Sequence, residues 1–474
     1  MAIFENERIF ELLQQFNPWW QSGGMAAALP AVRRTAYQQV MCTLTDTEIR
    51  RFAVLSGARR IGKTTVLMQV VEELLRQGVP PTSIFYVSFD NPILELCGFH
   101  QVWETYRRFV PHSGVYYAFL DEIQYAEEWS LWVKSLYDTE PQLRLAATGS
   151  ASPAIERGAS DSGVGRWRVF RMPTMTFREY CAVSGVEEPP SPLPMIEDLA
   201  RMDEAAFGML MLQLARLEPH WNRYLLQGGF PELVGVQDTA RAQQILREDV
   251  VDKVLKRDVP SLFDVRNTMD LEKVFLYLCL QSGNIINQAA VCSALGVTKP
   301  TLSRYIDYLR DANLIYISPS VSSHGKKGLK AQNKIYIADA ALRNACLMLN
   351  NPFARSEDMG MMAETAVYKH FLTAYGSTAK VGYLRLDGKQ KEVDIAVDFF
   401  PQESRILCEV KYRNTAELDS GDALLTLCRE HQASAAFVAT KSASDFGITR
   451  RADGVGVPLV RIPAPALCYL LNSK

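Results

Sequence analysis

Short apolar runs separated by longer amphipathic stretches dominate the first part of the chain. Four runs of strand length lie at residues 52–55, 84–89, 115–120 and 143–147, with room for a helix between them. Uniformly apolar runs are typical of strands covered on both faces, and strands that alternate with helices are typical of βαβ units. The pattern therefore predicts an α/β fold built around a parallel sheet.

The remainder of the chain changes its pattern three times. A proline-rich stretch near residue 187 introduces amphipathic helical sequence without a strand pattern, which continues to residue 266. Several short helices and a turn-rich hairpin follow, and the last part returns to mixed helix and strand. We expect four domains in an α/β multidomain protein, at residues 1–180, 181–266, 267–345 and 350–474, the second acting as a helical lid or connector.

The first predicted strand leads into a phosphate-binding loop. Residues 57–64, GARRIGKT, match G-x-x-x-x-G-K-[ST] in full, and a helical stretch follows. Glycines let such a loop wrap tightly, so that backbone N–H groups and the helix amino terminus face the phosphates of ATP. Lys63 is expected to reach the β- and γ-phosphates, and Thr64 to ligate Mg²⁺. The predicted ATP contacts in this segment are Gly57, Arg60, Gly62, Lys63, Thr64 and Thr65.

Two further strands end in polar residues that suit the same site. The run 115–120 ends in Asp121 and Glu122. Asp121 is expected to hold Mg²⁺ and Glu122 to polarise the attacking water, which predicts hydrolysis of ATP to ADP and phosphate as well as binding. The next strand ends in Thr148-Gly149-Ser150, where Thr148 and Ser150 are expected near the γ-phosphate, although this tripeptide is also a common turn.

An arginine that stabilises the transferred phosphoryl group is expected near such a site. Arg166 is the first candidate for this arginine finger, including one supplied to a neighbouring subunit of a homo-oligomer. Arg168, Arg171 and Arg257 are rival candidates. A plain surface position is the alternative for each of them.

These motifs resemble those of the prokaryotic AAA-type ATP-binding proteins. The resemblance covers nearly the whole chain and is carried by the segments 57–64, 120–122, 148–150, 170–180, 227–232 and 256–259. It implies a P-loop ATPase of the additional-strand, catalytic-glutamate type. Members of that family commonly carry a C-terminal domain of uncharacterised function.

The third region has the pattern of a winged helix. Helical sequence at 285–295, a short turn and a second helix at 299–309 make a helix-turn-helix pattern, and the apolar runs 315–317 and 334–337 predict a wing hairpin. Groove-facing side chains of the second helix and the basic loop of the hairpin are the expected DNA contacts. They are Lys299, Thr301, Ser303, Arg304, Lys326, Lys327 and Lys330. A winged helix that binds only protein is the alternative.

The charge distribution supports a local DNA contact. The chain carries a net charge of −2, which excludes a uniformly basic nucleic-acid coat. Residues 299–334 hold seven basic and two acidic side chains, a local charge of +5, so the remainder carries −7. A basic patch in an acidic chain is typical of phosphate contacts that weaken with salt.

Other features point to the cytoplasm and away from membranes. No apolar stretch approaches the roughly 20 residues of a spanning helix, and the amino terminus has no secretory pattern. The nine cysteines include no Cys-x-x-Cys pair. A disulfide framework or zinc site is therefore not expected, and a reducing compartment fits best.

The last region has the residues of a metal-dependent nuclease. Glu364 lies in a helical pattern, Asp394 in an apolar strand, and Glu409 and Lys411 alternate on one face of the next strand. Together they predict a cage in which Asp394 and Glu409 hold Mg²⁺ and Lys411 stabilises a phosphodiester transition state. The order resembles the PD-(D/E)XK restriction-endonuclease-like superfamily, except that Val393 stands where the signature has proline. An inherited fold without cleavage is the alternative.

The combined prediction is an ATP-hydrolysing protein that binds DNA through a winged helix and cleaves it with a magnesium-dependent C-terminal domain. The alternative function is a nucleotide-switched regulator that binds DNA or protein, with a C-terminal domain that serves as a non-cutting scaffold. A DNA-translocating motor would need a closed ring, which one sequence cannot show.

Overall fold

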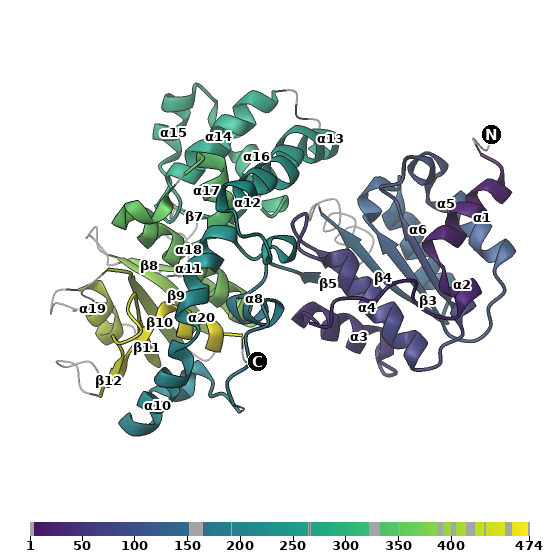
Figure 1. The fold of residues 1–474 in the computed structure, drawn as a ribbon. Coiled ribbons are helices and arrows are strands. Elements are labelled where there is room, and N and C mark those ends of the chain that lie inside the picture. Colours follow the sequence, from purple (N-terminus) through teal and green to yellow (C-terminus); the bar gives the residue numbers. More distant parts are fainter. Residues whose placement is uncertain are drawn as a thin grey trace. The chain divides into compact units, whose positions relative to one another are not determined.

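The chain forms two compact units in the computed structural model (Figure 1). The first is Met1–Met172 with Asp311–Asn313, and the second is Pro173–Arg310 with Leu314–Lys474. The structure describes residues 4–150, 165–190, 192–263, 265, 267–321, 332–349, 351–385, 392–399, 404–413, 422–430, 433–450 and 457–472. None of the helices in these ranges is long and apolar enough to cross a bilayer.

A five-stranded parallel sheet forms the centre of the first unit. Its strands are β1 (Phe52–Ser56), β2 (Ile84–Ser88), β3 (Tyr116–Asp121), β4 (Leu143–Gly149) and β5 (Trp167–Arg171). Their order is β2-β3-β4-β1-β5, so β4 lies between the strand that precedes the phosphate loop and the strand that carries Asp121. The four predicted strands and the parallel sheet are confirmed, and the inserted β4 agrees with the additional-strand type.

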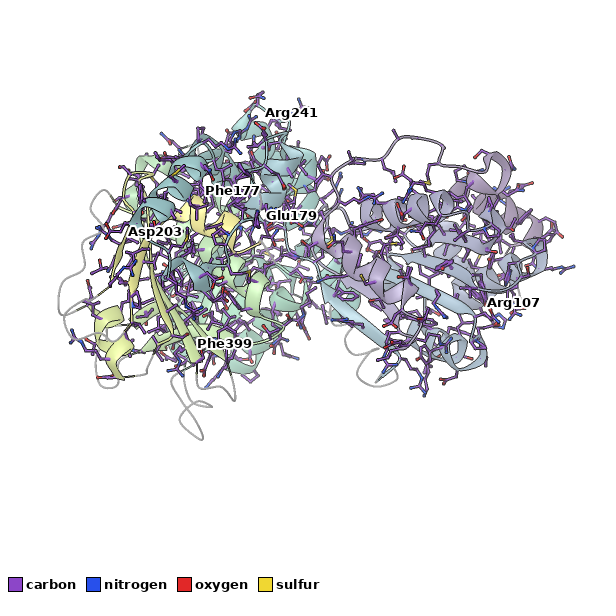
Figure 2. All side chains as sticks on the ribbon, turned by 90° about the horizontal axis from the view of Figure 1, so that it is seen from below. Arg107, Phe177, Glu179, Asp203, Arg241 and Phe399 are labelled. Carbon is purple, nitrogen blue, oxygen red and sulfur yellow. The ribbon has the colours of Figure 1, made fainter. Side chains whose placement is uncertain are left out.

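Helices cover the sheet of the first unit. They are α1 (Asn6–Phe16), α2 (Trp19–Ser22), α3 (Thr35–Thr45), α4 (Lys63–Arg76), α5 (Pro92–Phe109) and α6 (Trp129–Thr139). Aromatic side chains of α5 pack on β2, where Tyr106 stacks on Phe85 with ring centroids 4.3 Å apart. Arg107 of α5 lies at the surface of this unit (Figure 2). The apolar strands are therefore buried on both faces, as their sequence predicts.

The second unit begins with helices. They are α8 (Phe177–Val183), α9 (Ile196–Leu199), α10 (Glu204–Ala215), α11 (Glu218–Gln227), α12 (Thr239–Leu246) and α13 (Val259–Phe263), with π-helical turns at Arg247–Asp252 and Val254–Asp258. A capping box between Thr176 and Glu179 starts α8. Phe177, labelled beside Glu179 in Figure 2, packs on Trp221 of α11 with ring centroids 5.0 Å apart. The predicted helical character after residue 181 is confirmed.

Three helices and a hairpin follow in the second unit. They are α14 (Thr268–Leu280), α15 (Gln288–Leu295) and α16 (Lys299–Asp311), then β6 (Ile315–Ser318) and β7 (Lys334–Ile337), which pair antiparallel. Asn287 caps the start of α15, and Gly296 ends it with a φ of 68°, in the left-handed region. The predicted helix, turn, helix and hairpin are thus present, with α15 starting three residues later than predicted.

A six-stranded mixed sheet completes the second unit. Its strands are β8 (Lys380–Arg385), β9 (Glu392–Phe399), β10 (Ser404–Lys411), β11 (Ala435–Thr440), β12 (Gly447–Thr449) and β13 (Leu459–Pro463), in the order β12-β13-β11-β10-β9-β8. The accompanying helices are α17 (Ala340–Leu347), α18 (Ser356–Tyr375), α19 (Ala423–Glu430) and α20 (Ala464–Leu470). One hydrophobic core joins this sheet to α8, α10 and α11. The four-domain division remains a prediction.

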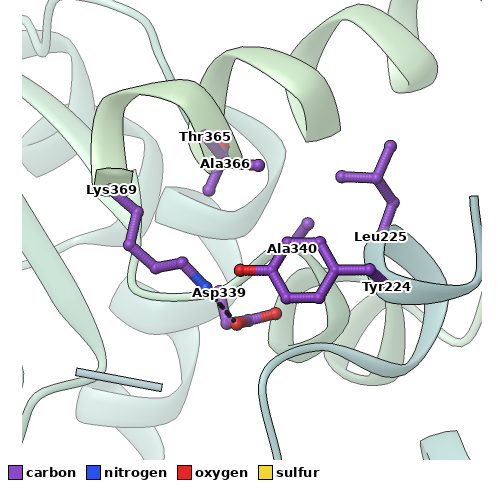
Figure 3. A pocket seen from close by; sticks show the side chains of 7 residues that line it. All are labelled: Tyr224, Leu225, Asp339, Ala340, Thr365, Ala366 and Lys369. Carbon is purple, nitrogen blue, oxygen red and sulfur yellow. Dashed lines mark hydrogen bonds and ion pairs between the residues drawn. The ribbon is translucent and has the colours of Figure 1, made fainter. Parts of the chain in front are cut away.

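A buried polar network holds distant segments of the second unit together. Lys369 of α18 donates to the carboxylate of Asp339 at 3.0 Å and to the hydroxyl of Thr174 at 2.9 Å. Asp339 also accepts from the Thr174 hydroxyl at 2.7 Å and from Gly229 N at 3.1 Å. Figure 3 shows the Lys369–Asp339 pair next to Tyr224 of α11. The conformation of the segments around residues 174, 229 and 339 therefore depends on one buried ion pair.

Candidate functional site

The phosphate loop has the backbone shape that its sequence predicts. It connects β1 to the amino terminus of α4, which begins at Lys63. Gly62 has a φ of 91° and Arg60 a φ of 63°, both in the left-handed region. Gly57 is enclosed, because a Cβ there would lie 2.4 Å from the carbonyl oxygen of Met172. The loop is thus a tight cradle at a helix amino terminus, which suits an anion.

Replacing Gly57 by alanine is expected to weaken ATP binding about tenfold or more. The added methyl group would have to displace backbone atoms of Met172, and overpacking of this kind costs about 1–3 kcal/mol. Binding of a fluorescent ATP analogue measures the effect. Gly24→Ala is the matched control, since no atom lies within 4 Å of its added Cβ. Equal affinity in the two variants would contradict the tight-cradle interpretation.

Lys63 lies inside the loop with its ammonium buried. Its Nζ donates to the carbonyl oxygens of Gly57 at 3.0 Å and Ala58 at 2.9 Å. It also lies 3.8 Å from Oε1 of Glu122. The lysine thus points into the loop, where bound phosphate oxygens would replace the carbonyls as its acceptors.

Asp121, Thr64 and Thr148 converge next to the loop. The Thr64 hydroxyl donates to Oδ2 of Asp121 at 2.6 Å, and the Thr148 hydroxyl donates to Oδ1. Burial raises the pKa of Asp121, and the two hydroxyls oppose that shift. A hydroxyl and a carboxylate that already touch beside the phosphate cradle are hard oxygen donors, so these residues fit Mg²⁺.

Glu122 is held as an ionised carboxylate facing the loop. Its backbone has a φ of 48°, and its amide donates to the Thr148 hydroxyl at 3.1 Å. Its Oε2 accepts from Gln124 Nε2 at 2.5 Å and from the Ser150 hydroxyl at 3.0 Å. Burial favours a higher pKa for Glu122, but Lys63, Gln124 and Ser150 outweigh it and lower the pKa. The carboxylate is therefore charged at neutral pH and able to orient a water.

Strand register explains why these residues meet. Ser56 pairs with Gly149, and Ser88 pairs with Asp121, so the carboxyl ends of β1 to β4 share one edge of the sheet. The structure brings Thr148 and Ser150 to the edge that holds the phosphate loop. Of the other predicted ATP contacts, Arg60 is exposed and Thr65 half-buried, both beside this cradle.

The candidate arginine finger lies at the other end of the sheet. Arg166 precedes β5, and its neighbour Trp167 pairs with Phe52, the first residue of β1. Its guanidinium forms an ion pair with Asp138 at 2.9 Å. Arg171, a rival candidate, pairs with Ser56 beside the phosphate loop. A role for Arg166 in hydrolysis would therefore require a neighbouring subunit.

Sequence reasoning missed two residues of this site. Tyr86 of β2 donates from its hydroxyl to Oδ2 of Asp121 at 3.1 Å, and burial beside that carboxylate raises the pKa of Tyr86. Gln124 bridges Glu122 and Ser150. Tyr86 lies two residues before the end of an apolar strand, and the sequence does not show that this strand pairs with β3, so no sequence signal marks it.

Four of the seven candidate DNA-contact residues lie on the first two turns of α16. Lys299, Ser303 and Arg304 are exposed, and Thr301 is half-buried with its amide bonded to the Thr298 hydroxyl at 3.3 Å. The opposite face is buried, as predicted, through Leu302, Tyr305, Ile306 and Leu309. Lys326, Lys327 and Lys330 lie outside the described residues.

The four predicted nuclease residues converge in the second unit, but they are not alone. Glu364 lies on α18, Asp394 on β9, and Glu409 and Lys411 on β10. Lys411 pairs with Glu409 at 3.0 Å, and Val410 N donates to Asp394 at 3.0 Å. A lysine from β7, Lys334, lies 3.3 Å from Asp394 and 3.6 Å from Glu364. Sequence reasoning missed it because it lies 30 residues before Glu364 in a different predicted domain.

Burial shapes the ionisation of this carboxylate cluster. Burial first, and the charge of Asp394 second, raise the pKa of Glu364 to about 7 and that of Glu409 to about 8. Burial alone would lower the pKa of Lys334, but Asp394, Glu364 and Glu392 hold it above its ordinary value. Among the described residues, no group of three or more His, Cys, Asp or Glu side chains is arranged for a metal. With the ammonium in place, these residues do not fit Mg²⁺.

Comparison with protein families divides the chain into three matched segments. Residues 50–181 match a family described as AAA domain. Residues 218–352 match a domain of unknown function (DUF8612), and residues 359–462 match another (DUF4143). The AAA match spans the phosphate loop, Asp121, Glu122 and Thr148.

Relatives and solved structures are distant. An uncharacterised protein of Haemophilus influenzae is 24% identical over 66% of this chain and 72% of its own length. One from Methanocaldococcus jannaschii is 22% identical over 74% of each chain. The Aeropyrum pernix ORC1 protein in complex with DNA has a TM-score of 0.30 at 15% identity, and covers 71% of this chain and 97% of its own. The Aeropyrum pernix ORC2 protein with ADPNP and ADP has a TM-score of 0.35 at 13% identity. That match covers 69% of this chain and 98% of the ORC2 chain.

The family match and the site geometry lead to one conclusion about the first unit. The match at residues 50–181 coincides with a parallel sheet in which β4 is inserted between β1 and β3. The phosphate loop, Asp121 and Glu122 meet at one edge of that sheet. The chain therefore carries an AAA-type P-loop ATPase domain.

Proposed function

We propose that this protein hydrolyses ATP in its first unit and uses the nucleotide state to control DNA binding through α16, while the C-terminal sheet serves as a scaffold. The observation that carries the proposal is the convergence of Thr64, Asp121, Glu122 and Thr148 on the phosphate loop. A loop that only bound nucleotide would not need an ionised glutamate held beside the lysine.

The residues of the site divide the work of hydrolysis. Mg²⁺, held by Thr64 and Asp121, would neutralise charge on the β- and γ-phosphates. Lys63 binds the same phosphates. Glu122 orients the attacking water and accepts its proton. Thr148 touches both Asp121 and the Glu122 amide, so it links the metal ligand to the water-orienting residue.

The DNA part of the proposal rests on α16. Its first two turns present Lys299, Ser303 and Arg304 to solvent, and the Gly296 turn separates it from α15, as in a helix-turn-helix. The positive charge available to DNA is smaller than the local +5 of residues 299–334. Lys334 is buried against carboxylates, and Arg310 pairs with Asp307 at 3.0 Å. We therefore assign the contact to α16 together with the basic segment that contains Lys326, Lys327 and Lys330.

Neutralising Lys299 and Arg304 together is expected to weaken binding of duplex DNA. Each lost phosphate contact reduces the magnitude of the slope of log affinity against log salt concentration by about one. The slope of the double alanine variant should therefore be smaller by about two. Fluorescence anisotropy with duplex DNA, with ADP and with a non-hydrolysable ATP analogue, measures both affinity and nucleotide control. Lys273→Ala on α14, an exposed lysine paired with Asp270, is the matched control.

The outcomes separate the parts of the proposal. Unchanged affinity and salt slope in the double variant would remove α16 as the DNA contact. Equal DNA affinity with ADP and the ATP analogue would remove nucleotide control and leave two independent activities.

A metal-dependent nuclease is the second candidate function. It is favoured by the meeting of Glu364, Asp394, Glu409 and Lys411, and by Oε2 of Glu409, which is buried without a hydrogen-bond partner among the described residues. Magnesium-dependent cleavage of plasmid DNA that disappears in Asp394→Ala would establish this candidate over the scaffold.

A further inference from the structure

The ammonium of Lys334 occupies the centre of the C-terminal carboxylate cluster. Its Nζ lies 2.7 Å from Glu392, 3.3 Å from Asp394 and 3.6 Å from Glu364. These carboxylates come from two different elements, α18 and β9, whereas the lysine comes from β7. Only 2% of the lysine is exposed to solvent. A buried ammonium with three carboxylates around it is fully compensated, which a buried charge requires.

The backbone around Lys334 fixes the ammonium in this position. Lys334 pairs with Ser318 of β6 on one side and bridges to Ile285 on the other. Its neighbours continue both contacts, since Gly283 N donates to Ile335 O at 2.8 Å and Ile286 N donates to Asn333 O at 3.0 Å. The lysine therefore belongs to a strand held on both edges, which fixes its backbone beside the carboxylates.

The spacing of the oxygens suits an ammonium and not Mg²⁺. Magnesium needs oxygens at about 2.0–2.1 Å in a nearly octahedral arrangement. The three carboxylate oxygens lie 2.7–3.6 Å from Nζ, the range of charge-assisted hydrogen bonds and close ion pairs. Tyr336 also donates to Oε1 of Glu364 at 2.7 Å, so this oxygen already has a hydrogen-bond donor. A metal ion would have to displace the lysine and draw the carboxylates inward.

The neighbouring pair does not offer a second cation position as it stands. Lys411 lies 3.0 Å from Glu409 and 3.7 Å from Asp422, so the lysine of the Glu-x-Lys motif is already paired with its own glutamate. The second oxygen of Glu409, Oε2, is buried and has no hydrogen-bond partner among the described residues.

We propose that the Lys334 ammonium is the resident cation of the cluster formed by Glu364, Glu392 and Asp394, and that the cluster accepts a divalent metal ion only when this ammonium is removed. The site of the predicted nuclease metal is then an internal ion-pair site. The contact also joins the β6–β7 hairpin to the C-terminal sheet through charge. This inference is independent of ATP hydrolysis and of DNA binding by α16.

Manganese binding to the nucleotide-free full-length protein tests the proposal. Free Mn²⁺ measured by electron paramagnetic resonance gives the number of bound ions. Wild type and Asp394→Asn are expected to bind equal numbers, because Lys334 already occupies the cluster. Lys334→Met is expected to bind one additional ion, and the double variant Lys334→Met/Asp394→Asn should lose it again.

A thermal measurement accompanies the binding assay. Lys334→Met leaves the carboxylates without their cation, so the variant is expected to unfold at a lower temperature than wild type in EDTA and to regain stability as Mn²⁺ is added. Lys380→Met is the matched control: Lys380 is exposed on the neighbouring strand β8, and its loss should change neither the ion count nor the unfolding temperature.

Two results would overturn the proposal. The first is a wild-type ion that Asp394→Asn removes, because the cluster would then hold metal with Lys334 in place. The second is a folded Lys334→Met variant that binds no additional ion. If Lys334→Met does not fold, the comparison between wild type and Asp394→Asn still decides the question.

Discussion

Replacing Glu122 by glutamine is expected to lower the rate of ATP hydrolysis about 100-fold or more and to leave ATP binding nearly intact. Glutamine keeps the acceptor oxygen that bonds to Ser150 but has no negative charge to polarise a water. Removal of a positioned general base typically costs about 10²–10⁴-fold in rate. Single-turnover hydrolysis and equilibrium binding of ATP, measured on the same preparation, separate the two effects.

The control for this variant lies in the same segment between β3 and α6. Glu127 is exposed five residues further on, and Glu127→Gln removes the same charge without touching the phosphate loop. Its hydrolysis rate should match wild type. If Glu122→Gln hydrolysed ATP at the wild-type rate, Glu122 would not orient the water, and another residue at the edge of the sheet would have to be sought.

Replacing Asp339 by alanine is expected to destabilise the second unit by about 3–5 kcal/mol, the range for breaking a buried ion pair. The change leaves the Lys369 ammonium buried, with Thr174 and the Met175 carbonyl as its remaining acceptors. It also removes the acceptor of Gly229 N and the cap of α17 at Ala341 N. Hydrogen exchange of α17 and α18 under increasing urea measures the loss, since a chain of two units does not unfold in one step.

Two companion variants make this result specific. Asp252→Ala removes a carboxylate from an exposed i,i+4 pair with Lys256, and should cost less than about 1 kcal/mol. The double variant Asp339→Ala/Lys369→Met should recover part of the loss, because no unpaired charge then stays buried. A loss in Asp339→Ala no larger than that in Asp252→Ala would mean that the network is not structural.

The parts of the molecule that could be predicted from the sequence are those defined by neighbouring residues. The phosphate loop is specified by its own glycines, Lys63 and Thr64, and the apolar runs of β1 to β4 specify a covered sheet. The positions of Asp121 and Glu122 could also be predicted, because a strand that ends in two acids places them at the sheet edge. Strand β5 escaped prediction because it lies at the sheet edge and carries two exposed arginines, Arg168 and Arg171, among its apolar residues.

The parts that could not be predicted depend on pairings between distant segments. Tyr86 reaches Asp121 only because β2 lies beside β3, and a tyrosine within a buried apolar strand has no mark of function. Lys334 was counted as part of a basic patch, whereas the fold buries it against acids at 364, 392 and 394. Net charge over a sequence window does not show which face of a strand a lysine occupies.

The lysine on β7 also fixes how the hairpin pairs. Successive side chains of a strand point to opposite faces, so a slip of one residue would turn Lys334 away and present Asn333 or Ile335 to the acids. The shifted pairing would leave three partly buried carboxylates without the ammonium that compensates them, which would destabilise the fold. The acids of α18 and β9 therefore stabilise only the native register of the hairpin. This holds although more than 50 residues separate Lys334 from Glu392 along the chain.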